Sequence, residues 1–157
     1  MKSKNWKIYA VNIAVALAVG AFSGILSMAG MEQYSMTAVK PALTPPAWLF
    51  PVAWTVLYTL MGIGAARIWL TPQSRERSRG LNLYTLQLIV NFFWSLIFFN
   101  AGAYGLAAIW LGLMWVLVLI MILEFAKSDR LAAVLQIPYL LWLTFAGYLN
   151  IAVWLLN

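Results

Sequence analysis

The stretch that decides the fold runs from Gly80 to Leu123, GLNLYTLQLIVNFFWSLIFFNAGAYGLAAIWLGLMWVLVLIMIL, and it contains no charged side chain. One helix crosses the hydrocarbon core with about 20 apolar residues, so this stretch is long enough for two. It is interrupted at Asn100–Gly105, NAGAYG, where two glycines and an asparagine suit a tight turn. The continuously apolar run Ile109–Leu123 lacks the alternation of barrel strands. We therefore expect two membrane-spanning helices, roughly 80–100 and 103–126.

Three further charge-free stretches, Ile8–Met31, Pro41–Ala66 and Leu131–Asn157, each fit one span. The chain is 64% hydrophobic and 9% charged, with a mean hydropathy of +0.87. Soluble domains are about 45–50% apolar and about 25% charged. The sequence therefore predicts an all-α fold, a single integral membrane domain over residues 1–157. Five transmembrane helices are expected at 7–28, 46–70, 80–100, 103–126 and 131–156. One long loop is expected at 29–45.

The N-terminal apolar segment has a second interpretation as a secretory signal peptide. Lys2, Lys4 and Lys7 form a basic n-region, and Ala16-Leu17-Ala18 resembles a cleavage site. The apolar run continues well past this point, to Met28, which favours a retained transmembrane helix.

The basic residues predict the orientation. With five helices, nine of the ten Lys and Arg residues fall on one side of the membrane, and only Lys40 falls on the other. Cytoplasmic loops carry the excess of Lys and Arg, so we expect a cytoplasmic N-terminus and an outer C-terminus. The loop 29–45 then lies outside, either as a lid over a binding site or as a simple spacer.

Several kinds of chemistry are disfavoured. The absence of Cys and His removes disulfides, Cys/His metal sites and histidine acid–base catalysis, so we expect no metal and no required cofactor. No charged side chain lies in the middle of a predicted span, which disfavours proton-coupled pumping. Nucleic-acid binding is also disfavoured, because the basic residues are few and lie at segment ends.

Polar residues within a span usually face the bundle interior. Such stripes occur in 7–28, 46–70, 80–100 and 131–156, which predicts a cavity among these four helices. The span 103–126 has almost none and is expected to be the helix most exposed to lipid or to a partner. The amides Gln87 and Asn91 lie one turn apart; they either bind a ligand or join helices, and their residue type favours the second.

Four of the nine tryptophans lie near the outer half of a span or on a polar stripe: Trp48, Trp54, Trp94 and Trp142. These indoles suit stacking on a flat aromatic ligand, although core packing is the simpler alternative. On the first helix, Ala16, Gly20 and Gly24 form a small-xxx-small series, which permits a close helix contact either within the bundle or between subunits.

Three ordered motifs resemble the TspO/MBR family, the tryptophan-rich sensory and translocator proteins, also called peripheral benzodiazepine receptors. The first motif is KPALTPPAW at 40–48 followed by FPVAWTVLY at 50–58. The second comprises Tyr84, Gln87-Leu88, Asn91, Trp94 and Phe98-Phe99. The third comprises Pro138-Tyr139-Leu140, Trp142, Phe145-Ala146 and Leu149-Asn150.

This resemblance implies a five-helix bundle in a bacterial cell membrane, often a homodimer. It also implies a pocket, covered by the first loop, for porphyrins such as protoporphyrin IX or haem and for isoquinoline- or benzodiazepine-type ligands. By position, Trp54 and Trp142 match the pocket tryptophans. The matching lining residues are Tyr58, Gln87, Asn91, Ala146 and Asn150, and the expected lid residues are Tyr34, Lys40 and Pro41.

The resemblance implies a tetrapyrrole-binding membrane receptor or sensor as the leading function. Light- and oxygen-dependent porphyrin degradation is an alternative, with Trp54 and Trp142 as its catalytic residues. Facilitated transport of a tetrapyrrole or another amphipathic ligand is the third. The expected partners are a tetrapyrrole ligand, membrane lipid and a second copy of the chain.

Overall fold

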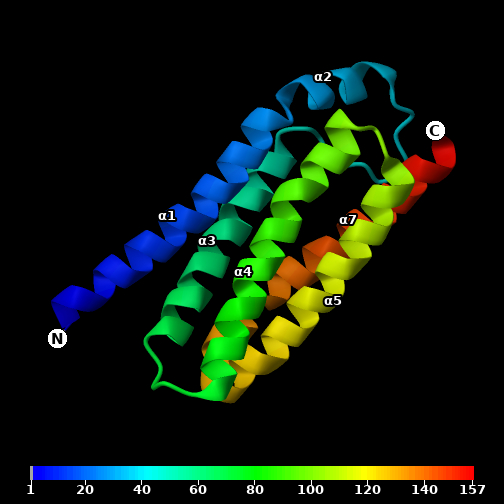
Figure 1. Cartoon of the computed structure of the whole chain (residues 1–157). Coiled ribbons are helices and arrows are strands. Elements are labelled where there is room, and N and C mark those ends of the chain that lie inside the picture. The colour runs from blue at the N-terminus through cyan, green and yellow to red at the C-terminus, as the bar shows by residue number, and fades with distance from the viewer. Residues whose placement is uncertain (1) are drawn as a thin grey trace.

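The computed structural model describes residues 2–157, and every regular element in this range is helical. Figure 1 shows the long helices running lengthwise beside one another, α2 lying across one end, and the two termini at opposite ends. The elements are α1 Lys2–Leu26, α2 Met28–Thr37, α3 Leu49–Trp69, α4 Arg75–Ser95, π-helical η1 Leu96–Asn100, α5 Tyr104–Ser128, α6 Arg130–Val134 and α7 Ile137–Leu156. Within the described residues, α1, α3, α4 with η1, α5, and α6 with α7 are each long and apolar enough to cross a membrane. The prediction of five transmembrane helices is confirmed.

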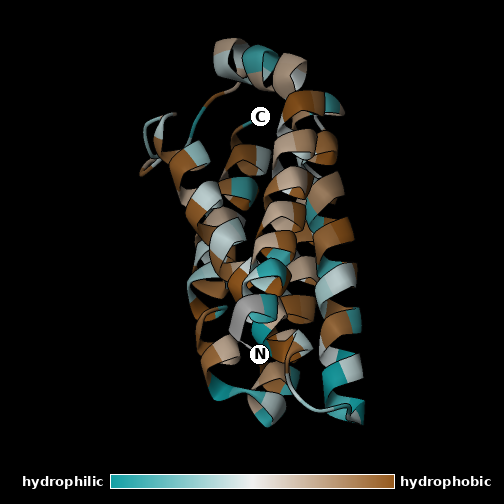
Figure 2. Ribbon diagram, turned by 90° about the vertical axis from the view of Figure 1, so that its left-hand side faces the viewer, coloured by the Kyte–Doolittle hydropathy of each residue, from teal (hydrophilic) through white to brown (hydrophobic). Residues whose placement is uncertain are grey.

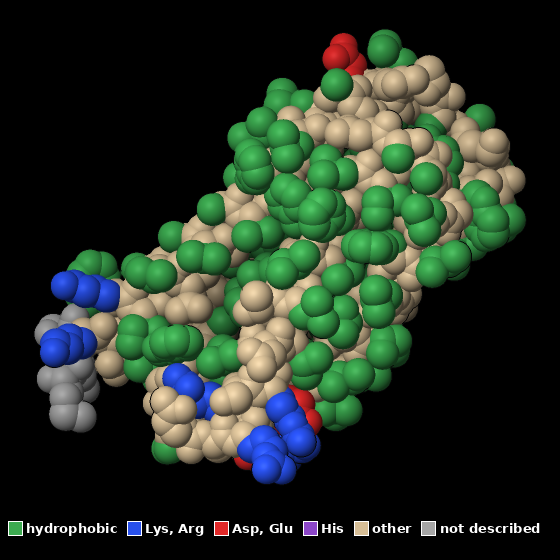
Figure 3. Space-filling model, in the orientation of Figure 1, with side chains coloured by type: hydrophobic (Ala, Val, Ile, Leu, Met, Phe, Trp, Pro, Cys, Tyr) green, Lys and Arg blue, Asp and Glu red, His purple; other side chains and the backbone are tan. Residues whose placement is uncertain are grey.

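The two ends of the bundle differ in polarity. Figure 2 shows hydrophilic residues concentrated at the end away from α2, and Figure 3 shows Lys and Arg side chains gathered there. We call this the basic end, and we call the opposite end, which carries α2, the α2 end. By the helix bounds, the basic residues at this end are Lys4, Lys7, Arg67, Arg75, Arg77, Arg79, Lys127 and Arg130. The charge separation on which the predicted orientation rests is therefore a real feature of the fold.

The third span starts earlier than residue 80, because α4 begins at Arg75. Ser74 caps the helix by accepting a hydrogen bond from the Arg77 amide at 3.1 Å, and Glu76 lies in the first turn, where a negative charge is favoured. The charged turn therefore extends the helix beyond its apolar part.

The predicted loop 29–45 is in fact helical over α2. Gly30 packs against the backbone of Phe99, at a distance that leaves no room for a Cβ atom. The Asn100 side-chain amide donates to the Leu26 carbonyl at 2.8 Å. These contacts hold α2 across the α2 end (Figure 1). Its residues, MAGMEQYSMT, include several good helix formers, a signal that the sequence prediction missed.

The last span is not continuous over 131–156. A turn at Leu135–Gln136 separates α6 from α7, and Pro138 occupies the first turn of α7. Proline has no amide hydrogen and is best accommodated in the first turn of a helix, which suits a break in the span just before Pro138.

The expectation that 103–126 is the most exposed helix is wrong. In α5, a stripe of buried side chains packs between α4 and α7: Ala107, Leu111, Met114, Val118 and Met121. It is α1 that lies at the periphery, with 11% of its apolar window buried against 28% for α5. The prediction failed because it took polarity as the mark of an interior face, whereas helices in membranes also pack through small and apolar side chains.

Candidate ligand-binding site

A cluster of aromatic side chains joins α3 to α7. The rings of Trp54 and Trp142 lie 6.4 Å apart between centroids, at 82° to one another. Tyr58, one turn further along α3, lies 5.4 Å from Trp54, and Tyr139 of α7 lies 6.2 Å from it. Phe50 contacts Trp142 at 5.9 Å. The structure therefore brings together the two tryptophans and the tyrosine that the sequence assigned to one site.

The two tryptophans of this cluster differ from three others in their hydrogen bonding. The indole N–H groups of Trp94, Trp110 and Trp115 donate to protein acceptors at 2.7–3.0 Å. Among the described residues, no acceptor lies within reach of the corresponding groups of Trp54 and Trp142, which are half-buried. These two donors are therefore available to a bound molecule.

A buried polar network lies directly behind the aromatic cluster. The Tyr58 hydroxyl donates to Asn91 Oδ1 at 2.8 Å, and Asn91 Nδ2 donates to the Tyr139 hydroxyl at 2.6 Å. The Tyr139 hydroxyl in turn donates to Gln87 Oε1 at 2.8 Å. All four side chains are at most 6% exposed, and they join α3, α4 and α7. Gln87 and Asn91 therefore join helices in this structure, the role that their residue type favoured.

Two more predicted residues form a second link. The Trp94 indole donates to Asn150 Oδ1 at 3.0 Å, and Asn150 Nδ2 donates to the Tyr104 carbonyl at 2.8 Å. Because both ends of the buried Asn150 amide are used, its observed role is to tie α4 and α5 to α7. Ala146, on α7 like Asn150, is half-buried and packs against the main hydrophobic core.

The segment between α2 and α3, which we call the strap (residues 38–48), runs down the side of α7. Val39 exchanges two hydrogen bonds of 2.9 Å with the side chain of Asn157, and the Ala42 carbonyl accepts one of 2.9 Å from Tyr148. Just beyond the strap, Phe50 reaches Trp142. Residue numbers rise along the strap while they fall along α7, so the strap follows α7 from its C-terminus down to the aromatic cluster.

The predicted lid residues divide between two places. Tyr34 on α2 packs against Phe98 and Phe99 of η1 at 5.4 and 5.3 Å, not against the two tryptophans of the cluster. Burial, and then the neighbouring Tyr104, raises the pKa of Tyr34 above its ordinary value, so this residue is a neutral packing group. The other two lie on the strap: Lys40 is exposed, with Nζ 5.3 Å from the Tyr34 ring centroid, and Pro41 is buried.

Trp48, at the N-cap of α3, is 65% exposed and points away from the protein interior. Trp48 is therefore more exposed than the half-buried tryptophans of the cluster. This exposure suits a position at the membrane–water interface better than one inside a binding site.

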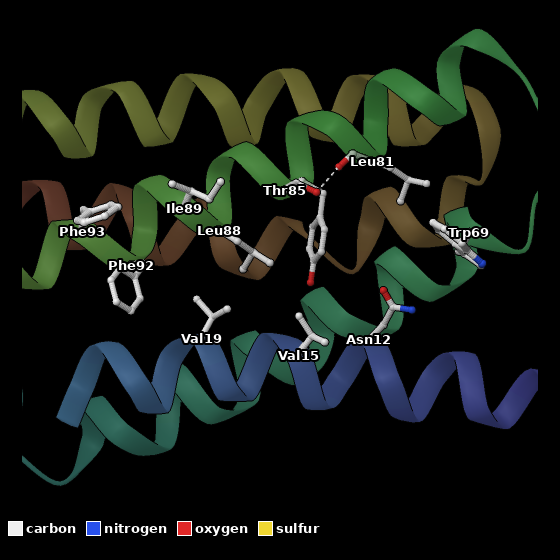
Figure 4. Close-up of a pocket in the computed structure, with 11 residues that line it drawn as sticks. Asn12, Val15, Val19, Trp69, Leu81, Thr85, Leu88, Ile89, Phe92 and Phe93 are labelled. Atoms are coloured by element: carbon white, nitrogen blue, oxygen red, sulfur yellow. Dashed lines mark hydrogen bonds between the residues drawn. The ribbon is translucent and has the colours of Figure 1, made fainter. Parts of the chain in front are cut away.

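A separate groove of about 420 Å³ lies on the side of the bundle, between α1 and α4. Figure 4 shows Asn12, Val15 and Val19 of α1 facing Leu88 and Phe92 of α4 across it. None of the predicted ligand-binding residues lines this groove. Its walls are mostly apolar, and the polar side chains among them are Asn12, Tyr84 and Thr85, so it offers few groups that would orient a specific ligand.

Comparison with known proteins places the chain in a family. Residues 12–155, nearly the whole chain, match the TspO/MBR family. The chain belongs to the TspO/MBR family. It is 35% identical to the tryptophan-rich protein TspO of Chlorobaculum tepidum, over 94% of each chain. It is 36% identical to protein CrtK of Rhodobacter capsulatus, over 96% of this chain and 92% of the relative. It is also 33% identical to the translocator protein of Bos taurus, over 92% of this chain and 88% of the relative.

In this TspO/MBR protein, one residue central to the site was missing from the predicted set. Tyr139 is 1% exposed and belongs both to the aromatic cluster, through its ring, and to the polar network, through its hydroxyl. The signal was present, because Tyr139 precedes Trp142 by three residues and so shares its helix face. The site is thus an aromatic wall held in place by a hydrogen-bonded layer.

Proposed function

We propose that this protein is a membrane receptor or sensor that binds porphyrin-type tetrapyrroles, and that isoquinoline- and benzodiazepine-type compounds occupy the same site. The observation that carries the proposal is the half-buried pair Trp54 and Trp142, with two indole donors that have no acceptor among the described residues. Flat aromatic molecules gain about 0.5–1.5 kcal/mol from each well-placed ring, beyond the apolar area that they bury. The names of the relatives, a tryptophan-rich protein and a translocator protein, fit a ligand-handling role.

The rigid layer behind the tryptophans supports this proposal. Tyr139 cannot move without breaking its bonds to Asn91 and Gln87, and its ring packs edge-on against Trp54. A site whose aromatic wall is held by buried hydrogen bonds loses little side-chain freedom when a ligand binds.

The strap covers the approach to the site. It lies over α7 between the α2 end and the aromatic cluster, and Tyr148 and Asn157 hold it by hydrogen bonds at exposed positions. We infer that a ligand reaches the tryptophans when the strap moves aside. The carboxylates of a porphyrin would then stay near Lys40, the exposed basic residue on the strap.

The orientation follows from the same charges. If the basic end is cytoplasmic, as the excess of Lys and Arg there predicts, the strap and α2 face the outside of a bacterial cell membrane. The site would then receive its ligand from the outer side.

The test is a titration of the purified protein, in detergent, with protoporphyrin IX, followed by the porphyrin absorbance band. We expect Trp54→Leu and Trp142→Leu each to weaken binding by about 2- to 12-fold, the equivalent of one aromatic contact. Trp69→Leu is the matched control, because Trp69 is an exposed tryptophan at the basic end. Unchanged affinity in both cluster variants, or equal weakening in the control, would show that the assignment is wrong.

Transport is the second candidate, and the translocator proteins among the relatives favour it. The measurement is porphyrin flux into proteoliposomes compared with protein-free vesicles. Flux that exceeds the vesicle rate and falls in Trp142→Leu would establish transport through the same site. Photodegradation is scored in the same samples: porphyrin bleaching in light and oxygen that stops in the double variant Trp54→Phe/Trp142→Phe would assign these residues a catalytic role.

A further inference from the structure

A second groove, of about 390 Å³, opens between α4 and α5 near the basic end. Its lining residues form two facing helical stripes: Arg79, Asn82, Leu83 and Leu86 on α4, with Ile120 and Glu124 on α5. No residue of the aromatic cluster or of the strap lines it. The proposed porphyrin site and this groove are therefore separate features of the molecule.

The groove changes in polarity along the bundle axis. Because α4 runs away from the basic end and α5 runs toward it, Arg79 and Glu124 lie at the mouth. Leu86 and Ile120 lie deeper, by about 10 Å and 6 Å along their helices. Figure 3 shows this transition on the visible face, where basic and acidic side chains meet at the lower end and hydrophobic side chains cover the surface above. A ligand matched to the groove carries charge at one end and hydrocarbon at the other.

The two charged residues at the mouth are not paired with each other. One carboxylate oxygen of Glu124, Oε1, accepts from Lys127 Nζ at 2.9 Å. The other, Oε2, is buried and has no donor among the described residues. Arg79 is exposed and forms no ion pair within this part of the chain. The mouth therefore has one exposed cation, Arg79, and one carboxylate, Glu124, whose Oε2 is enclosed by the protein and lacks a donor.

We propose that this groove binds an aminophospholipid of the surrounding leaflet, with its phosphate on Arg79, its primary ammonium on Glu124, and an acyl chain along Leu83, Leu86 and Ile120. A guanidinium is well suited to phosphate. Basic pockets between transmembrane helices are known sites for lipid headgroups.

The carboxylate distinguishes among headgroups. A headgroup with only a negative charge satisfies Arg79 and leaves Glu124 Oε2 without a donor. A choline headgroup has a positive charge but no N–H group, so it cannot donate a hydrogen bond. A primary ammonium supplies both the charge and the donor, which selects phosphatidylethanolamine over phosphatidylcholine and phosphatidylglycerol. Asn82, exposed between the charged mouth and the apolar floor, is placed to donate to an ester carbonyl of the same lipid.

The experiment is native mass spectrometry of the full-length protein, delipidated in detergent and incubated with equal amounts of phosphatidylethanolamine, phosphatidylcholine and phosphatidylglycerol. We expect phosphatidylethanolamine to be retained most. Glu124→Gln should reduce its advantage over phosphatidylcholine by about tenfold, the usual effect of one hydrogen bond to a charged group. Arg79→Gln should weaken retention of all three lipids.

Two further variants separate binding from folding. Glu76→Gln removes a carboxylate from the same end of α4 but outside the groove, and it should leave the preference unchanged. Leu86→Trp fills the groove from a position that is 46% exposed, so it should block retention while the unfolding midpoint stays the same. Equal retention of the three lipids, a preference for phosphatidylglycerol, or a preference that survives both Glu124→Gln and Leu86→Trp would overturn the proposal.

Discussion

Tyr139→Phe tests whether the buried polar network holds α4 and α7 together. The variant keeps the ring but loses the hydroxyl, which accepts from Asn91 and donates to Gln87. Interhelical hydrogen bonds in membrane bundles are worth about 0.6 kcal/mol on average and up to about 1.7. Two are lost, and both partner groups stay buried, so we expect the free energy of unfolding to fall by about 1–3 kcal/mol.

Two other tyrosines calibrate this value. Tyr58→Phe loses a single bond, to Asn91, and should be destabilised by about half as much as Tyr139→Phe. Tyr148→Phe loses a bond to the Ala42 carbonyl at a residue that is 43% exposed, and its stability should change by less than about 0.5 kcal/mol.

The assay is reversible unfolding in mixed micelles, followed by near-ultraviolet circular dichroism. A double-mutant cycle with Gln87→Leu isolates the energy of the bond between the Tyr139 hydroxyl and Gln87. Each single variant leaves one polar partner of that bond unpaired, whereas the double variant removes both partners. We expect the double variant to be more stable than the sum of the two single changes predicts. A Tyr139→Phe protein as stable as Tyr148→Phe, or a coupling energy of zero in the cycle, would refute this account of the network.

Two more predictions concern α1 and the basic end. Gly20→Ala should lower the thermal unfolding midpoint, because the added Cβ would overlap the Tyr58 ring. Gly24→Ala, where an added Cβ meets nothing within 4 Å, should leave the midpoint unchanged or raise it. Equal effects of the two substitutions would contradict the contact between Gly20 and Tyr58. Burial alone would raise the pKa of Asp129, but the hydrogen bond and charge of Arg67 outweigh it and hold the pKa below its ordinary value. The Arg67–Asp129 pair therefore stabilises the protein at neutral pH, and this contribution is lost as the pH falls below about 4, through the folded-state pKa. Asp129→Asn keeps the cap on Leu131 but not the charge, so its deficit in unfolding midpoint at pH 7 should shrink at pH 3, and a deficit that is the same at both values would count against the pair.

Gly20 also answers a question that the sequence left open. The small-xxx-small series on α1 predicted a close contact without saying whether it lies within the bundle or between subunits. Ala16 is fully buried, and Gly20 lies against Tyr58 of α3, so the contact is internal at these two positions. Gly24 meets nothing within 4 Å, so the series serves two different surfaces. Spacing identifies residues on one helix face, but it does not identify their partner.

The span count could be predicted from the sequence because it depends on length and charge, which are local properties. The role of α5 could not, because its interior face is made of Ala107, Leu111, Met114 and Val118, and no polar residue marks it. The helix α2 was missed for a related reason. Gly30 of α2 packs on Phe99 of η1, and Asn100 of η1 bonds to the end of α1, and both contacts join residues about 70 positions apart, so no local pattern records them.

For the candidate site, the residue identities were predictable but most of their observed roles were not. Trp54, Trp142 and Tyr58 lie together as the motifs implied. Gln87 and Asn91, by contrast, both hydrogen-bond to tyrosines of the aromatic cluster, so in this structure they help to position the aromatic wall. An amide in mid-span must find a partner, and the sequence alone cannot show whether that partner is a ligand or a neighbouring helix.

The strap explains why the site lies within the bundle and not at its end. The helix α3 begins beside Trp142, because Phe50 in its first turn contacts that residue, and α7 continues for a further 14 residues to Leu156. The strap covers the part of α7 that α3 is too short to reach, down to the contact between Phe50 and Trp142. A continuous helix in this place would seal α7 with packed side chains along its whole length. A segment held by three hydrogen bonds, all to exposed residues, can be displaced at far smaller free-energy cost, so the proposed site would combine a rigid aromatic wall with a cover that can move aside.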